Sequence, residues 1–198
     1  MMKKAIYLVA ALIIFAAGAN IAYDSVKSLN IARCLGCIAM EPKAVKFEEF
    51  WVEYPDHYNN KGIPPHPDWV VNASKQKVVM LFFWGPSCEP CERQWEAMKK
   101  AGLVKGSEEN GSITANFSYI QLFSINAPYD DEKGEAIRIY TPKGDTGTPT
   151  TVILFEKNGT IYWYAFSGEA NGEGGRPDIN ELINILEKAK EEKYDLQS

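Results

Sequence analysis

Histidine is scarce in this 198-residue chain, acidic residues outnumber basic ones, and no internal repeat is present. The formal net charge of −5 leaves no basic excess to neutralise phosphates, which argues against nucleic acid as a partner. The only histidines, His57 and His66, show no spacing typical of a metal site, and we expect the ring of His66, which stands among prolines, to face water. The remaining composition, 45% hydrophobic and 24% charged, is that of an ordinary globular protein.

Long hydrophobic runs are absent apart from one, Ala5 to Ala19, which follows the positively charged start Met1 to Lys4. This is the layout of an export signal or a membrane anchor. Its length falls between the roughly 7 to 15 residues of a signal-peptide core and the roughly 20 that span a bilayer. We predict that residues 1–23 form a hydrophobic helix that anchors the chain, with secretion after cleavage as the alternative. In either case the rest of the chain would lie outside the cytoplasm.

A Cys-x-x-Cys motif, Cys88 to Cys91, stands between the apolar run Val78 to Trp84 and the amphipathic stretch Glu92 to Lys100. The run predicts a buried β-strand and the stretch predicts a helix. Where a strand turns into a helix at such a motif, the first sulfur lies at the positive end of the helix dipole, which stabilises a thiolate. The sequence therefore predicts a site for thiol–disulfide exchange.

Further elements follow in a definite order. Thr148-Pro149 precedes the apolar run Thr151 to Phe155, so a proline stands at the start of a strand, where it need not donate a ladder bond. The other predicted elements are a strand over Phe117 to Ile125, a helix over Asp131 to Tyr140, a hairpin turn at Asn158-Gly159, and a final helix with an Asp178/Glu181 capping box. Polar tracts at 106–116 and 126–134 indicate an insertion in this region.

The cysteine motif, the proline loop and this order of elements, from about Val78 to Leu186, resemble the thioredoxin family. The resemblance implies an α/β thioredoxin fold, with a central mixed sheet flanked by helices and the Cys-x-x-Cys facing a cis-proline loop. Phe83 to Cys91 is most similar to the membrane-tethered, extracytoplasmic reductases, including those of cytochrome c maturation. That similarity implies exchange with protein thiols or disulfides, and a membrane electron donor as one source of electrons. It implies no cofactor.

The residues of the motif predict distinct roles. Cys88 is expected to attack the partner's sulfur, and Cys91, one turn into the helix, to be shielded and to resolve the mixed disulfide. Pro90 fixes the backbone where helix amides have no partner. Glu89 places a negative charge beside the sulfur and should raise the Cys88 pKa, which predicts a moderately reducing centre.

Around the motif, Thr148 and Pro149 are expected to present backbone to the partner's chain, and Trp84 to line the site. Glu89 and Pro90, between the cysteines, are likewise expected to contact the substrate. Two positions depart from the family. Phe82 stands where thioredoxin has a buried acid, six residues before its first cysteine, and Ser87 replaces the aromatic residue that commonly precedes it. The contacts with substrate and the route of the second thiol's proton are therefore left open.

A second pair, Cys34 and Cys37, lies ahead of a predicted helix that carries Phe47, Phe50, Trp51 and Tyr54 on one face. Three interpretations remain open: a redox pair that exchanges electrons with the first pair or a membrane partner, a structural disulfide, and half of a zinc site. An oxidising compartment closes a nearby pair without any function, which favours the structural disulfide. Zinc needs four ligands and haem attachment needs a His after the second Cys, so we expect no metal.

These features divide the chain into residues 1–23 as anchor or signal peptide, 24–77 as a linker with a helical extension, and 78–198 as a thioredoxin-like domain. The predicted function is that of an enzyme, a thiol–disulfide oxidoreductase acting on protein cysteines outside the cytoplasm. The alternative is a redox-inert module that keeps the thioredoxin shape in order to hold a partner.

Overall fold

The computed structural model describes residues 50–58, 61–141, 144 and 146–195. The predicted N-terminal helix, Cys34, Cys37 and Phe47 lie outside the described residues. Within these ranges, no helix combines the length and the apolar character needed to cross a bilayer.

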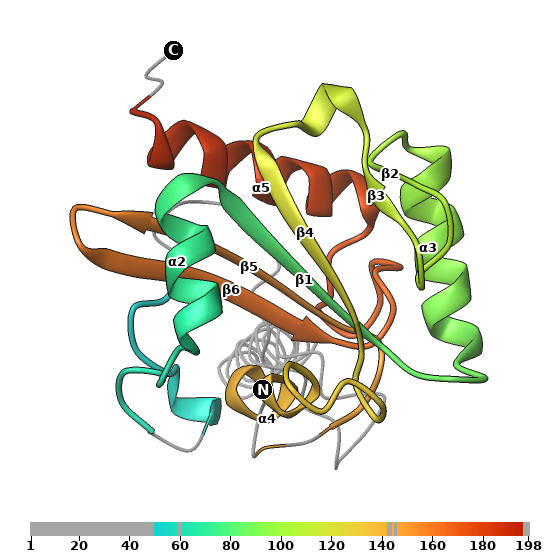
Figure 1. The fold of residues 1–198 in the computed structure, drawn as a ribbon, viewed down its shortest axis with the longest axis horizontal. Helices are drawn as coiled ribbons and strands as arrows, with labels where there is room; N and C mark the ends of the chain where they lie inside the picture. The colour runs from blue at the N-terminus through green and yellow to red at the C-terminus, as the bar shows by residue number, and fades with distance from the viewer. Residues whose placement is uncertain (1–49, 59–60, 142–143, 145, 196–198) are drawn as a thin grey trace, which may run out of the picture. The chain divides into compact units, whose positions relative to one another are not determined.

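A mixed sheet of four strands, in the order β4-β1-β5-β6, forms the centre of the fold (Figure 1). Strand β1 (Val78–Trp84) pairs in parallel with β4 (Ile120–Asn126) and antiparallel with β5 (Thr150–Lys157). Strand β5 continues through a hairpin into β6 (Thr160–Ser167). All seven residues of β1 are buried, as expected of a central strand that is covered on both faces.

Helices cover both faces of the sheet. Successive side chains of a strand point to opposite faces, so each strand contributes to the packing on both sides. One face of β1, from Val78 to Trp84 at every second residue, packs with residues of α3 (Glu89–Lys100) and α5 (Ile179–Lys193). The intervening side chains pack with residues of α2 (Asp68–Gln76) and α4 (Ile137–Tyr140). The α/β class and the central mixed sheet flanked by helices are thus confirmed.

The local signals near the C terminus are confirmed in detail. Asn158 and Gly159, at the turn between β5 and β6, have φ angles of 54° and 81°. The Asp178 carboxylate accepts hydrogen bonds from the amides of Asn180 and Glu181, at 2.8 and 2.9 Å. The Glu181 carboxylate accepts one from the Asp178 amide at 2.9 Å, which completes the capping box of α5.

The helix predicted through Phe50, Trp51 and Tyr54 is wrong for the described part of that segment. Trp51 instead forms a β-bridge with Trp163 of the edge strand β6, with N···O distances of 2.8 and 2.9 Å. Its ring lies edge-on to Trp163, with centroids 4.8 Å apart. The backbone groups of an edge strand are available for pairing. The amide and carbonyl of Trp51 therefore form their hydrogen bonds with β6 instead of within a helix.

The helix predicted over Asp131 to Tyr140 begins later than expected, with the short helix η4 (Gly134–Ala136) followed by α4. The Asp130 carboxylate accepts hydrogen bonds from the amides of Glu132 and Lys133, at 3.2 and 2.9 Å. Such a side-chain acceptor competes with helical hydrogen bonding and holds these residues in a turn.

The first polar tract supplies the turn and the second strand of a small hairpin of β2 (Val104–Lys105) and β3 (Ser112–Ile113). It docks on α3 through Trp95, whose indole nitrogen donates a hydrogen bond to the Gly106 carbonyl at 3.0 Å. Two more short helices, η2 (Asp56–Tyr58) and η3 (Ala115–Phe117), complete the described elements; η3 delays the start of β4 to Ile120.

The expectation that His66 faces water is wrong. Its Nδ1 lies 2.8 Å from the Tyr140 hydroxyl, and the two rings stack with centroids 5.7 Å apart. Burial of the imidazole lowers the pKa of His66 from 6.5 to about 4, because the charged form loses its hydration.

Stability should therefore fall in mild acid. The folded pKa of His66 lies below its unfolded value, so between pH 6.5 and about 4 the unfolded chain binds more protons than the folded chain does. The contribution of the neutral His66 ring to the free energy of unfolding is complete above pH 6.5 and is lost as the pH falls through about 4. We expect it to be about 2 kcal/mol after allowance for the ring's residual exposure. Urea titrations at several pH values should give a shallower pH dependence for His66→Gln, and equal slopes would contradict the prediction.

Candidate redox site

Cys88 and Cys91 form a disulfide where β1 gives way to α3, with their Cα atoms 5.2 Å apart. Cys88 is the N-cap of the helix, and its Sγ accepts a hydrogen bond from the Cys91 amide at 3.3 Å. Pro90 lies in the first turn, where no amide partner is lost, and Ser87 makes the turn from the strand with a φ of 57°. The amide and the helix dipole both favour negative charge on the Cys88 sulfur.

The two cysteines differ in access. Cys88 is half-buried, whereas Cys91 is 1% exposed and packs in the core between the sheet and α3. A partner that approaches from solvent therefore meets Cys88 first.

The proline loop lies beside this sulfur. The Thr148–Pro149 peptide is cis, and the Thr148 hydroxyl donates a weak hydrogen bond to Cys88 Sγ at 3.6 Å. A Cβ placed on Gly85 would lie 3.6 Å from the Thr148 hydroxyl and 3.8 Å from the Pro128 ring. The loop that follows β4 and the proline loop thus converge on the turn that carries Cys88.

An arginine moderates the charge of Glu89, which is 81% exposed. Arg93, one turn along α3, contacts the Glu89 carboxylate at 2.6 Å and that of Glu169 at 2.8 Å. Both carboxylates raise the pKa of Arg93, and Glu169 has the larger effect. Because Arg93 partly neutralises Glu89, the rise in the Cys88 pKa expected from Glu89 alone should be smaller. Sequence reasoning missed Arg93, although its i, i+4 spacing from Glu89 is a readable signal.

Gln94 fixes the helix beneath the disulfide. Its fully buried amide donates to the Thr151 hydroxyl at 2.8 Å and accepts from the Ala170 amide at 3.1 Å. These bonds join α3 to β5 and to the loop after β6. Phe82, where the family carries an acid, is fully buried and packs on Trp95 at a centroid distance of 5.6 Å. Sequence reasoning missed Gln94, which is recognisable only as a polar residue on the apolar face of the helix.

Replacing Gln94 with methionine should reduce the free energy of unfolding by about 2 kcal/mol, because it strands the buried Ala170 amide and the Thr151 hydroxyl. The control is Gln76→Met at the exposed end of α2, for which no comparable loss is expected. Chemical denaturation measures both, and a Gln94→Met variant as stable as the control would contradict this account.

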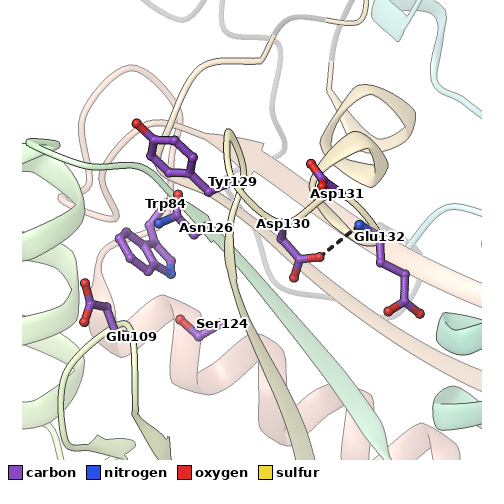
Figure 2. Close-up of a pocket in the computed structure, with 8 residues that line it drawn as sticks. All are labelled: Trp84, Glu109, Ser124, Asn126, Tyr129, Asp130, Asp131 and Glu132. Carbon is purple, nitrogen blue, oxygen red and sulfur yellow. Dashed lines mark hydrogen bonds between the residues drawn. The ribbon is translucent and has the colours of Figure 1, made fainter.

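The indole nitrogen of Trp84 makes no hydrogen bond to the disulfide. Trp84 instead lines a neighbouring cavity of about 590 Å³, which is drawn in Figure 2. The walls come from the end of β1, the β2–β3 loop, β4 and the loop after it; the lining residues are Trp84, Glu109, Ser124, Asn126, Tyr129, Asp130, Asp131 and Glu132. In the part of the chain that the structure describes, no three His, Cys, Asp or Glu side chains are grouped so as to hold a metal ion.

The mixed sheet with its flanking helices, and the cysteine pair directly after β1, are consistent with a thioredoxin-like fold. A disulfide at the start of a helix is consistent with a redox centre. Comparison with known proteins adds no assignment, since no protein-family model and no curated protein matches this chain.

Proposed function

We propose that this protein is a thiol–disulfide oxidoreductase that acts on the cysteines of other proteins through Cys88 and Cys91. The observation that carries the proposal is the position of the disulfide. It caps a helix, its more exposed sulfur accepts an amide hydrogen bond, and the Thr148 hydroxyl stands beside that sulfur.

In the reducing direction the Cys88 thiolate attacks one sulfur of a partner's disulfide. A Cys88–partner bond forms, and the partner's other sulfur leaves as a thiolate. Cys91, once deprotonated, then attacks Cys88, so the Cys88–Cys91 bond forms and the partner's second sulfur leaves. Two electrons pass from this protein to the partner, and the reverse sequence oxidises a partner dithiol.

The neighbouring residues would serve this exchange. Glu89, moderated by Arg93, and Pro90 set the charge and shape of the exposed turn. Thr148 and Pro149 offer backbone to an extended partner chain beside Cys88, in the manner of an added strand. Trp84 supports the same surface from the end of β1. The proposed location, outside the cytoplasm with residues 1–23 as the anchor and a membrane electron donor as the source of electrons, rests on the sequence alone.

The test is the redox behaviour of this one pair in the full-length Cys34→Ser/Cys37→Ser variant. We expect Cys88 of the reduced protein to be alkylated at pH 7 faster than an ordinary thiol, whose pKa is about 8.5. We also expect equilibration with glutathione at a moderately reducing potential. A Cys88 no more reactive than a free thiol would contradict the proposal and favour the redox-inert binding module.

A further inference from the structure

Two buried polar atoms in the wall of the cavity beside the disulfide have no hydrogen-bond partner among the described residues. They are the indole nitrogen of Trp84 and the amide oxygen of Asn126. Trp84 is only 6% exposed, and Figure 2 shows the nitrogen-bearing edge of its ring turned toward Ser124, another wall residue. A buried polar group without a partner is costly, so such groups favour a ligand that carries both an acceptor and a donor.

The residues that line this cavity carry charge of one sign. Glu109, Asp131 and Glu132 are exposed, and the lining set contains no Lys, Arg or His. Of the three, Glu132 also contacts Lys133, outside the lining set, with the Lys133 Nζ 3.4 Å from its carboxylate. Asp130 also lines the cavity, but its carboxylate already accepts hydrogen bonds from the amides of Glu132 and Lys133. Tyr129, in the same loop as Asp131 and Glu132, is 72% exposed. An exposed aromatic ring and carboxylates around one cavity are suited to the aliphatic stem and charged head of a lysine or arginine.

The cavity adjoins the disulfide through a short chain of contacts. Tyr129 follows Pro128, which faces Gly85, and Gly85 also faces Thr148, whose hydroxyl touches the Cys88 sulfur. A polypeptide whose sulfur reacts at Cys88 can therefore reach this cavity with residues near its own cysteine.

We propose that the cavity binds a basic stretch of the substrate polypeptide, close to the cysteine that exchanges with Cys88. The peptide's backbone carbonyl and amide would pair with Trp84 and Asn126, and its lysine or arginine would lie among Glu109, Asp131 and Glu132. This inference rests on the proposed function and narrows its substrates to proteins with basic residues flanking a cysteine.

The experiment measures attack by the reduced full-length Cys34→Ser/Cys37→Ser protein on peptides that carry one cysteine as a thiopyridine disulfide. The cysteine is flanked by lysines, serines or glutamates, and release of thiopyridone gives the rate. Each rate is divided by that with hydroxyethyl disulfide, which is neutral and has no peptide chain, and whose reduction is followed by the loss of protein thiols. We expect the lysine peptide to react about tenfold faster than the glutamate peptide at low salt. The ratio should fall at high salt, which screens exposed charges.

A pair of variants with equal charge separates the cavity from the protein's overall field. Glu109→Gln/Asp131→Asn/Glu132→Gln should bring the lysine-to-glutamate ratio close to one. Glu191→Gln/Glu192→Gln/Asp195→Asn removes as much charge at the C-terminal end of α5. That end contacts the segment before β1 through Lys193, at the opposite end of β1 from the disulfide, so this variant should keep the preference. Equal ratios in the two variants, or no preference in the parent, would overturn the inference.

Trp84→Phe tests the unpartnered indole, since it keeps an aromatic ring and removes the N–H. The normalised rate with the serine peptide should fall about fivefold, the effect of one lost hydrogen bond. An unchanged rate overturns the assignment of this nitrogen to the peptide. Failure of the parent to react even with hydroxyethyl disulfide would overturn the proposed function, and this inference with it. Reaction without peptide selectivity overturns this inference alone.

Discussion

Replacing Cys91 with serine should make the protein accumulate as a stable mixed disulfide with its partner. Cys88 can still attack, but the sulfur of Cys91, whose Cα lies 5.2 Å from that of Cys88, is no longer present to displace the partner. In the Cys34→Ser/Cys37→Ser background, incubation with a peptide disulfide should give a covalent adduct that is visible by mass spectrometry and is released by dithiothreitol. Turnover should fall to the uncatalysed background.

The matched variant is Cys88→Ser, which retains the buried thiol and removes the accessible one. Because Cys91 is 1% exposed, this variant should form no adduct and should also lose turnover. Adduct formation at Cys91 in place of Cys88 would reverse the assigned roles. Equal trapping by both single variants would show that burial does not select the attacking sulfur.

Replacing Gly111 with alanine should reduce the free energy of unfolding by about 3 kcal/mol, the upper part of the range for overpacking a filled site. A Cβ at this position would lie 2.0 Å from the Trp95 ring and 2.4 Å from the Ser107 carbonyl oxygen. Neither group can yield easily, because the ring is held by its bond to the Gly106 carbonyl and the oxygen belongs to the backbone. The β2–β3 hairpin would have to move away from α3. Urea denaturation measures the loss.

Gly85→Ala is the control for that substitution. Its Cβ would meet its nearest neighbour, the Thr148 hydroxyl, at 3.6 Å, which is an ordinary contact, and its φ angle is not positive. We expect its stability to stay within about 1 kcal/mol of the parent. If the two variants lose similar free energy of unfolding, the closeness of Trp95 to position 111 does not explain the glycine at that position.

Much of the fold was predictable because its signals are local. The apolar run from Val78 to Trp84 is a buried strand, and the turn at Asn158-Gly159 takes the positive φ angles that these residue types tolerate. The capping box at Asp178 requires only residues within one helical turn. The position of the cysteine motif between a strand and a helix is likewise predicted by the residues on either side of it.

The errors arose where distant partners compete with local preference. The aromatic spacing around Trp51 is compatible with a helix face, but the free edge of β6 offered backbone pairing. His66 looked solvated among prolines, but the Tyr140 ring, far along the chain, covers it. The link from Arg93 to Glu169 and the pairing of Gln94 with Ala170 also join segments far apart in sequence. Periodicity carries no information on such contacts.

By itself the sequence determined the order of the four sheet strands and of α3, α4 and α5 along the chain, the location of a dithiol pair at a helix start, and the turn and cap chemistry, since each depends on residues a few positions apart. Tertiary structure alone decided that the Thr148 hydroxyl stands at the Cys88 sulfur and that an acidic cavity opens beside it. These properties depend on how the strand ends and loops converge at one edge of the sheet. That convergence is fixed by packing of both sheet faces rather than by any single segment.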